Sequence, residues 1–575
     1  MKREYTVADF FCGAGGFSEG FRQSGFKVVF ALDNWDYARK THKLNHPECD
    51  HAVNGDILAL DVEKINELIP DTDIIIGSPP CVTFSTSNRA GKADKTSGIE
   101  LINKFFQIIA IKKYKPNSKL KYWLMENVPN SRHFLLEKYS FKDLGITDEN
   151  LKRLKIKKNQ KDIALTVDKS ENKIYNSVYY GVPQRRERLI VGEFPEPRKI
   201  TYNENSWIHL GEILNAFRAA NGLVKDPLYD LSVKKKKITD HFYKTDIPKF
   251  EWEEAMIKKQ QARYYGKMAF PEDEEKPART VMATRSIVAR EAMIFSNGKS
   301  NTYRAPTIRE VASIMSFPIT YLFDGIDESI KYKLVGNAVC PKMAYCFALS
   351  ILKDNRIQPP KPLLEKVDIP SYFVDLQKNN PKEKKPRPKP LNSNFAEIVP
   401  DLKSKNFRIE LDNNFPKMNG GRIKWRASIH HATGKSSMKS AYPGLSEVRN
   451  ILRKFPNQNK INLFAKKIIS LRPRIPISAR LYQNQFCLPK FDRRYLTPRQ
   501  TLKKIKILLD EHFPEKKYEG ISLTNVRGFK IQSRYLKFNR GAPPSNQIPL
   551  RHLLALFGLI YLINQITNNK NLGEL

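Results

Sequence analysis

The 575-residue chain is short of acidic residues. Its 60 Asp and Glu stand against 99 Lys and Arg, which gives a formal charge of +39 and a pI near 9.8. A cationic excess of this size is typical of proteins with a polyanionic partner such as nucleic acid. It argues against a small acidic substrate, which needs far fewer positive charges.

Cysteine and long apolar runs are also scarce. The six cysteines form no CxxC or paired Cys/His motif, so we expect neither a disulfide framework nor a metal site, and a reducing cytoplasm fits this usage. They are Cys12, Cys49, Cys81, Cys340, Cys346 and Cys487. The late run "LLALFGLIYLI" is too short to span a bilayer, and "MKREYTVADFFCGAGG" has no secretory core, so we predict a soluble chain without a membrane partner.

The positive charge is concentrated towards the C-terminus. Residues 356–575 carry 43 basic and 15 acidic side chains, a net +28, against +11 for the preceding 355 residues. Between the two parts lies "KNNPKEKKPRPKPLN", whose prolines and lysines favour an extended, solvated linker. With this length we expect two or three domains, with a boundary near residue 390.

The first 200 residues alternate between strand and helix patterns. We predict strands at "YTVADFF", "KVVFALD", "DHAVN", "DIIIGS", "KYWLMENV" and "RERLIVGEF", with helices at "FSEGFRQSG" and "NWDYARKTHKLN". Strands separated by helices favour a doubly wound, mostly parallel α/β sheet. In such a sheet, ligands bind beyond the carboxyl ends of the strands.

A glycine-rich turn follows the first predicted strand. In "DFFCGAGGFSEGF", Gly13, Gly15 and Gly16 would let the backbone approach a ligand closely, unless they serve only a tight turn. Ser18 stands where a GxGxxG dinucleotide fingerprint needs its third glycine. A nucleoside ligand without a pyrophosphate fits better.

Two acidic residues follow the next strands in order. Asp33 is placed to accept hydrogen bonds from ribose hydroxyls, as acidic residues at this strand end do in nucleotide-binding folds. Asp56 in "NGDIL" could bind an adenine amino group, with Ile57 against the ring. Taken in strand order with the glycine turn, they predict a nucleoside pocket.

A single cysteine follows two prolines after the strand "DIIIG". The prolines restrict the backbone in front of Cys81 and would hold its thiol in one place at the ligand-facing edge. A lone cysteine is more often a buried structural residue, so its neighbours decide between a core residue and a nucleophile.

Those neighbours are a carboxyl group and two guanidinium groups. Glu126 and Asn127 end the strand in "YWLMENVPN", and Gln184, Arg186 and Arg188 lead into the strand of "YYGVPQRRERLIVG". A charged run such as "QRRER" is usually solvated. Its position beside a strand of the same sheet favours convergence with Cys81.

In order and spacing these motifs resemble the DNA (cytosine-5) methyltransferases of bacterial restriction–modification systems. The resemblance spans residues 5–350 and rests on "DFFCGAGG", "GDI", "PPCVTFS", "ENV", "QRRER" and "GNAV". It implies S-adenosylmethionine as methyl donor and a cytosine flipped out of double-stranded DNA. The residues that it implies for cofactor binding are Phe11, Gly13, Gly15, Gly16, Asp33, Asp56, Ile57, Pro80 and Asn337.

The resemblance also implies the chemistry. The Cys81 thiolate adds to carbon 6 of the base, Glu126 hydrogen-bonds ring N3 and the exocyclic amine, and Arg188 binds O2 with support from Arg186.

The chain departs from the family pattern at two positions. Val82 replaces a usual glutamine after the catalytic cysteine. Ser97 replaces a usual arginine before Gly98, the glycine of the mobile loop.

The same resemblance suggests a domain scheme. We expect a catalytic core at 1–200, a target-recognition segment at 201–290 that includes the lysines 234–237, a return to the core at 291–355, a basic linker at 356–395 and a basic C-terminal domain at 396–575. It implies a monomer in the bacterial cytoplasm that acts beside a separate cognate endonuclease.

The resemblance does not reach the C-terminal part. "GGRIKWRASIHHATGKSSMKSA" and "NVRGFKIQSRYLKFNRG" interleave basic and aromatic residues, which favours DNA binding over the alternative of a fused nuclease with clustered acids. Adjacent histidines on a basic segment are usually surface residues, as we expect for His430 and His431. An RNA cytosine-5 methyltransferase is a further alternative. Many of those enzymes use a second cysteine near "ENV", and this chain has none there. The intact set of thiol, carboxyl and arginine argues against a catalytically idle DNA binder.

Overall fold

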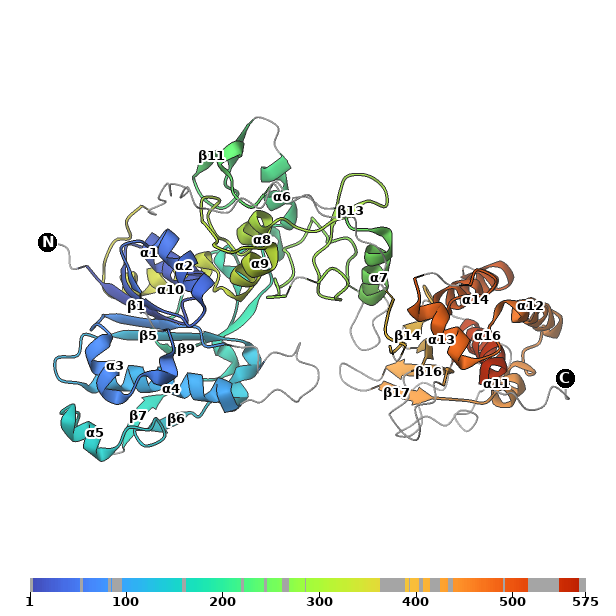
Figure 1. Ribbon diagram of the computed structural model, residues 1–575, viewed down its shortest axis with the longest axis horizontal. Helices are drawn as coiled ribbons and strands as arrows, with labels where there is room; N and C mark the ends of the chain where they lie inside the picture. Colours follow the sequence, from blue (N-terminus) through green and yellow to red (C-terminus); the bar gives the residue numbers. More distant parts are fainter. Residues whose placement is uncertain are drawn as a thin grey trace. The chain divides into compact units, whose positions relative to one another are not determined.

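The protein divides into two compact units (Figure 1), Met1–Ala255 with Ala269–Lys382, and Met256–Met268 with Glu383–Leu575. The division after Lys382 falls inside the segment that we expect to be a linker. The computed structural model describes residues 4–567 except 52–54, 81–83, 85–95, 158–161, 219–221, 242–245, 261–267, 285, 362–387, 392, 403–406, 414–423, 433–437, 490–491 and 516–547.

Unit 1 is built on a seven-stranded sheet of order β3-β2-β1-β4-β5-β9-β8. Its strands are β1 (Thr6–Phe10), β2 (Lys27–Leu32), β3 (Asp50–His51), β4 (Ile74–Gly77), β5 (Tyr122–Asn127), β8 (Ile174–Asn176) and β9 (Glu187–Glu193). All six predicted strands are confirmed, and β1 to β5 pair in parallel. The expectation of parallel pairing fails at β9, which runs antiparallel to β5, and β8 is antiparallel to β9. The sheet is therefore mixed.

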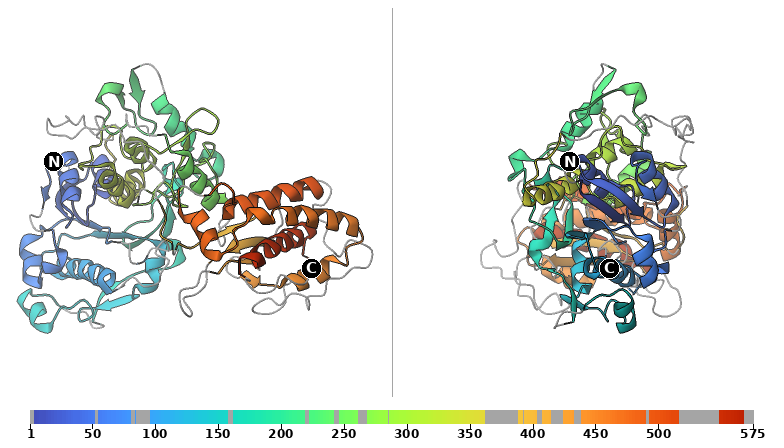
Figure 2. Two further views of the ribbon diagram at one scale, coloured as in Figure 1. Left: turned by 45° about the vertical axis from the view of Figure 1, so that its right-hand side comes forward. Right: turned by 90° about the vertical axis from the view of Figure 1, so that its left-hand side faces the viewer.

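Helices cover both faces of this sheet (Figures 1 and 2). Strand residues alternate between two cores, so that Ile74 and Ile76 of β4 face one and Ile75 faces the other. The first core includes α1 (Gly16–Gln23), α8 (Ile308–Ile314) and α10 (Pro341–Asp354), and the second includes α3 (Val62–Leu68) and α4 (Thr96–Tyr114). The stretch Glu328–Asp354, which contains α9 (Glu328–Asn337) and α10, is apolar and long enough to cross a membrane, but 78% of its apolar window is buried in the fold.

Smaller elements complete unit 1. The helices are α2 (Asp36–Asn45), α5 (Asp148–Arg153), α6 (Leu210–Arg218) and α7 (Lys249–Gln260), the last crossing into unit 2. Three two-stranded sheets are β6 (Lys138–Ser140) with β7 (Ile163–Thr166), β10 (Leu223–Lys225) with β11 (Ser232–Lys234), and β12 (Phe295–Ser296) with β13 (Tyr303–Arg304). Short 3-10 turns lie at Ile57–Ala59, Pro129–Phe134, Glu171–Lys173, Ser177–Tyr180, Glu204–Ser206 and Lys235–Lys237. The lysines 234–237 thus end β11 and continue into such a turn, with Lys234, Lys236 and Lys237 exposed.

Unit 2 combines a four-stranded antiparallel sheet with helices. The strands are β14 (Ala396–Ile398), β15 (Phe407–Asp412), β16 (Arg426–Ala432) and β17 (Met438–Ala441), and the helices are α11 (Leu445–Leu452), α12 (Gln458–Ser470), α13 (Ala479–Cys487), α14 (Pro498–His512) and α16 (Leu550–Thr567), with a 3-10 turn at Arg472–Arg474. The apolar α16 is the centre of this unit and packs on β15, β16, α11, α12 and α14.

The expectation that His430 and His431 lie on the surface is wrong. Both are only 1% exposed, because β16 is a central strand of the sheet. The ring nitrogens of His430 lie 2.8 and 2.6 Å from the hydroxyls of Ser428 and Ser440. Of the two basic and aromatic segments, residues 525–541 lie outside the described structure, as do parts of residues 420–441.

Candidate active site at the carboxyl edge of the sheet

The glycine-rich turn after β1 is wound in the left-handed region of the backbone. Phe11 has a φ of 56°, Gly13 of 54° and Gly15 of 85°. Such a φ is unusual for a bulky side chain like that of Phe11, and strained residues of this kind cluster at functional sites. Among the described residues other than its chain neighbours, the one atom within 4 Å of the position of a Cβ on Gly13 is the Phe11 carbonyl oxygen, at 3.9 Å. The turn therefore leaves open space at Gly13, as a cradle for a ligand requires.

Gly15 and Gly16 are glycine for a different reason. A Cβ on Gly15 would press on the Tyr321 hydroxyl, and one on Gly16 would collide with the Val339 carbonyl. The Tyr321 hydroxyl donates a hydrogen bond of 2.6 Å to the Ala14 carbonyl. These two glycines hold the start of α1 against the segment that returns to the core, and both are buried.

Asp33 and Asp56 lie at the ends of the strand segments where the sequence places them. The Asp33 carboxylate accepts hydrogen bonds from the backbone of Gly13 at 2.9 Å and of Trp35 at 2.8 Å. Burial raises the pKa of Asp33, while these two bonds lower it. Asp56 is exposed and accepts from the Leu58 backbone at 3.0 Å, which caps the turn at Ile57–Ala59.

Two contacts refine the predicted pocket around these acids. Gly55 packs so closely on the Asp33 carbonyl that no side chain would fit, which brings the two acidic segments together. Ile57, expected against an adenine ring, is 1% exposed and belongs to the core between β1, α3 and α4.

The proline turn after β4 is tied to two neighbouring strands. The Ser78 hydroxyl donates to the Phe11 carbonyl at 3.0 Å, and the Asn127 side chain donates to the Pro79 carbonyl at 3.2 Å. Pro80 is exposed. The next two residues, Cys81 and Val82, lie outside the described residues.

The predicted loop position Ser97–Gly98 is helical in the structure. Both residues lie in the first turn of α4, which begins at Thr96. Gly98 is buried there and Ser97 is exposed.

Glu126 and Arg188 form an ion pair beside this proline turn. The Arg188 Nε lies 2.8 Å from the Glu126 carboxylate, and the two side chains are 12% and 8% exposed. Glu126 is near the end of β5, and Arg188 is near the start of β9. Because β9 is antiparallel to β5, its first residues lie at the edge where β5 ends. The pair is thus next to the residue that anchors Pro79.

Arg186 and Gln184 hold the returning segment instead of facing the open edge. The Arg186 guanidinium donates at 3.1 Å to the carbonyls of Val281, Gly336 and Ala338, and the residue is 3% exposed. The Gln184 carboxamide accepts from the Val281 backbone at 2.9 Å. Asn337, which ends α9 between two of these carbonyls, is exposed.

The geometry thus brings the glycine turn, bonded to Asp33, and an acid–arginine pair to one edge of the sheet. Residues 5–353 match the family described as "C-5 cytosine-specific DNA methylase", and the chain belongs to this family. It is an enzyme of this class, a DNA (cytosine-5) methyltransferase. The family match ends before unit 2 resumes at Glu383.

Individual relatives agree with this assignment. The chain is 29% identical over 374 residues to type II methyltransferase M.MthTI of Methanothermobacter thermautotrophicus, covering 60% of this chain and 97% of the relative. It is 27% identical over 372 residues to type II methyltransferase M1.HphI of Haemophilus parahaemolyticus, covering 61% and 87%. Among solved structures, the Entamoeba histolytica methyltransferase EhMeth is 16% identical with a TM-score of 0.39, covering 62% of this chain and 99% of that one.

Proposed function

We propose that the enzyme methylates carbon 5 of a cytosine flipped out of double-stranded DNA, through a covalent adduct with Cys81, and so protects host DNA in a restriction–modification system. The observation that carries this proposal is the Glu126–Arg188 pair beside the Asn127 bond to Pro79. That bond holds the backbone two residues before Cys81, so a base bound by the pair would lie within reach of the thiol.

The open edge of the sheet fits S-adenosylmethionine. Gly13 offers space for close approach. Four further residues of the proposed site are partly or fully exposed, namely Asp33, Asp56, Pro80 and Asn337. When bound, the cofactor supplies an electrophilic methyl group. Asp33 would hold the ribose and Asp56 the adenine amine, while Phe11 and Ile57 would shape the walls of the pocket. Gly15 and Gly16 contribute by setting the position of the turn.

The protein residues make the cytosine reactive. The Cys81 thiolate adds to carbon 6, and Glu126 hydrogen-bonds N3 and the exocyclic amine, so that electron density moves to carbon 5. Arg188 binds O2 as negative charge develops on the ring. After methylation the carbon 5 proton passes to water and the Cys81–carbon 6 bond breaks, which regenerates the thiolate. Arg186 acts here as a positioning residue through its three carbonyl contacts.

The remaining parts of the chain handle DNA. Residues 201–290 read the target sequence, with the lysines at 234–237 on phosphates, and residues 291–355 return to the core. Residues 356–395 act as a linker, and the basic residues 396–575 bind the DNA backbone. The enzyme acts as a monomer in the bacterial cytoplasm beside a separate endonuclease.

Bisulfite sequencing of DNA incubated with the purified chain and S-adenosylmethionine tests this proposal. We expect methylated cytosines within one recognition sequence. The Cys81→Ser variant should bind DNA as tightly as the unaltered chain but should not methylate it. Cys346→Ser, a buried cysteine of α10, is the matched control. Turnover by Cys81→Ser would refute the covalent mechanism. Methylation of RNA alone, or cleavage of unmodified DNA with Mg²⁺, would favour one of the two alternative activities.

A further inference from the structure

Three metal-binding side chains meet at the outer edge of the sheet, where the sequence analysis expects no metal site. They are His42 of α2, Cys49 of the following loop and His51 of β3, and one ligand atom of each lies within 4.8 Å of the other two. His42 and Cys49 are buried and His51 is half-buried. The pattern is His-x6-Cys-x-His, which differs from the CxxC and paired-histidine spacings of common zinc motifs.

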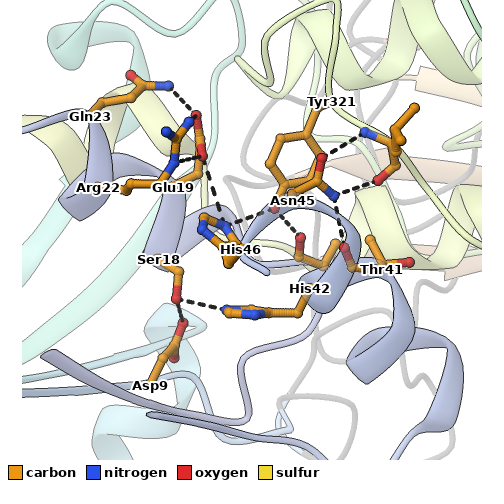
Figure 3. Close-up of polar contacts among 12 residues, drawn as sticks. Asp9, Ser18, Glu19, Arg22, Gln23, Thr41, His42, Asn45, His46 and Tyr321 are labelled. Carbon is orange, nitrogen blue, oxygen red and sulfur yellow. Dashed lines mark hydrogen bonds and ion pairs between the residues drawn. The ribbon is translucent and has the colours of Figure 1, made fainter. Parts of the chain in front are cut away.

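The hydrogen bonds of His42 determine which of its nitrogens carries the proton. Its Nε2 lies 3.0 Å from the Ser18 hydroxyl, and that hydroxyl donates to the Asp9 carboxylate at 2.7 Å (Figure 3). Since the Ser18 proton is directed at Asp9, the Ser18 oxygen accepts from Nε2–H of His42. The second nitrogen of the ring, Nδ1, therefore presents its lone pair. Ligand histidines in metalloproteins are oriented by outer hydrogen bonds of this kind.

His51 presents a second lone pair to the first. Its Nε2 lies 2.8 Å from Nδ1 of His42, and the ring also hydrogen-bonds to the backbone of Cys49. That bond stabilises a ring N–H towards the Cys49 carbonyl, and because Nε2 faces His42 it falls to Nδ1. The two nitrogens lie 2.8 Å apart, so they either share a proton or, in these tautomers, offer both lone pairs to one cation.

We propose that this cluster binds a zinc ion through His42 Nδ1, Cys49 Sγ and His51 Nε2, with water at the fourth position. Zn–N bonds of about 2.0 Å and Zn–S bonds of about 2.3 Å place tetrahedral ligand atoms about 3.3 to 3.6 Å apart. On zinc binding, the two nitrogens, which lie 2.8 Å apart, need to separate slightly. The sulfur lies within 4.8 Å of both nitrogens and needs to move closer to them. A thiolate with two imidazoles favours zinc over the oxygen-seeking Mg²⁺ and Ca²⁺.

The charges and protons balance in this arrangement. Binding releases the thiol proton of Cys49 to solvent, because a coordinated thiol is deprotonated. The thiolate and the Asp9 carboxylate behind Ser18 then compensate the two positive charges of the ion. His51 is half-buried, which leaves a route for the ion to enter from solvent.

The ion would stabilise an edge strand of the sheet. β3 is described over the two residues Asp50–His51, and in the described part of the chain it pairs with β2. It leads within five residues to Asp56, which we place at the cofactor. A link from β3 to α2 would therefore hold this side of the cofactor pocket in place.

Metal analysis of the untagged, full-length chain tests the proposal. We expect one zinc per chain after dialysis, and a thiolate-to-metal charge-transfer band after replacement by Co²⁺. Cys49→Ser should lose the band and the zinc, and His51→Gln should lose most of the zinc. The matched controls are Cys346→Ser, a buried cysteine of α10, and His133→Gln, an exposed histidine, and both should keep one zinc.

A second measurement does not depend on variants that fold. Treating the unaltered chain with a chelator should lower its melting temperature, and Zn²⁺ but not Mg²⁺ should restore it. If the purified chain contains no zinc and takes up none when Zn²⁺ is added, the two histidines share a proton instead of a metal ion. That result would overturn the proposal. Zinc or a cobalt–thiolate band retained by a folded Cys49→Ser would overturn it as well, since the ion would then lie elsewhere.

Discussion

Two arginines separated by a single residue have opposite environments at the sheet edge. Arg186 is buried and its guanidinium donates to three backbone carbonyls, whereas Arg188 pairs with Glu126 beside the proline turn. Side chains of like charge in one short motif therefore serve different purposes. Replacing each by lysine, which keeps the charge but loses the planar fork, separates the two functions.

Arg188→Lys should lower the rate of methyl transfer by about 100-fold, as the loss of one donor to a developing charge does in other enzymes. Its melting temperature should stay close to that of the unaltered chain. Arg186→Lys should instead reduce the free energy of unfolding by about 2 to 4 kcal/mol, because it leaves buried carbonyls without donors. Transfer of a labelled methyl group and thermal denaturation measure both. Equal effects of the two variants on both quantities would contradict the assigned roles.

Asp56→Ser should weaken S-adenosylmethionine binding by about 0.5 to 1.5 kcal/mol, because the hydrogen bond from the adenine amine to the carboxylate is lost. Serine still caps the turn at Ile57–Ala59, so stability should hardly change. Asp61→Ser is the control, since Asp61 caps α3 in the same way. Titration calorimetry that finds the same affinity for both variants would place the adenine elsewhere.

At the scale of elements, the start of α1 depends on close contact with the segment before α10. Gly16→Ala would push a methyl group into the Val339 carbonyl, and such overpacking usually costs about 1 to 3 kcal/mol. We expect a lower melting temperature for unit 1 and weaker cofactor binding. Gly444→Ala is the control, because no atom of the described residues other than its chain neighbours lies closer than 3.8 Å to the added Cβ. Equal melting temperatures for the two variants would argue against this tight contact.

The central helix of unit 2 should lose stability in mild acid. Burial, together with repulsion from the adjacent Arg551, lowers the pKa of His552 in α16 to about 4. Between pH 6.5 and 4 the unfolded chain binds a proton that the folded chain does not, so stability falls as the pH drops through this window. The shift of the pKa from 6.5 to about 4 corresponds to a loss of about 3 kcal/mol in the free energy of unfolding, most of which has occurred near pH 4. Hydrogen exchange of the α16 amides, corrected for its intrinsic pH dependence, measures this loss, and His552→Gln should remove most of it.

At the scale of the whole molecule, the charge is divided unevenly along the chain. Residues 362–575 carry a net charge of +26 out of +39. Each phosphate contact releases counterions, so most of the salt dependence of DNA binding should come from this part.

A chain that ends at residue 361 should bind DNA more weakly and with a shallower salt slope. It keeps the hydrogen bonds of Asn355 to Tyr5 and Tyr122, so the end of α10 stays attached to the sheet. It also keeps the proposed recognition segment, and we expect its sequence preference to persist. Fluorescence anisotropy over a salt series, together with methylation of target and scrambled duplexes, measures both properties. An unchanged slope would mean that the charge of unit 2 does not face DNA.

The sequence by itself determined six strands of the sheet in unit 1, the helices α1 and α2, and the order of the site motifs. Strand and helix periodicity, glycine at the turn after β1, and polar residues at strand ends are local signals. They predict that Asp33, Asp56 and Glu126 lie at one edge, because parallel strands share one carboxyl edge.

The tertiary structure alone decided which of these side chains meet. The direction of β9 depends on pairing with β5, and only the antiparallel pairing brings Arg188 to Glu126. Arg186 turns away because a segment about 100 residues later supplies the carbonyls that it binds. His430 is buried for a similar reason, because its strand is flanked on both sides. The cluster of His42, Cys49 and His51 is also a tertiary feature, because His42 lies on α2 and His51 lies on the edge strand β3. The spacing of these residues in the sequence does not encode how closely a helix and a strand bring them together.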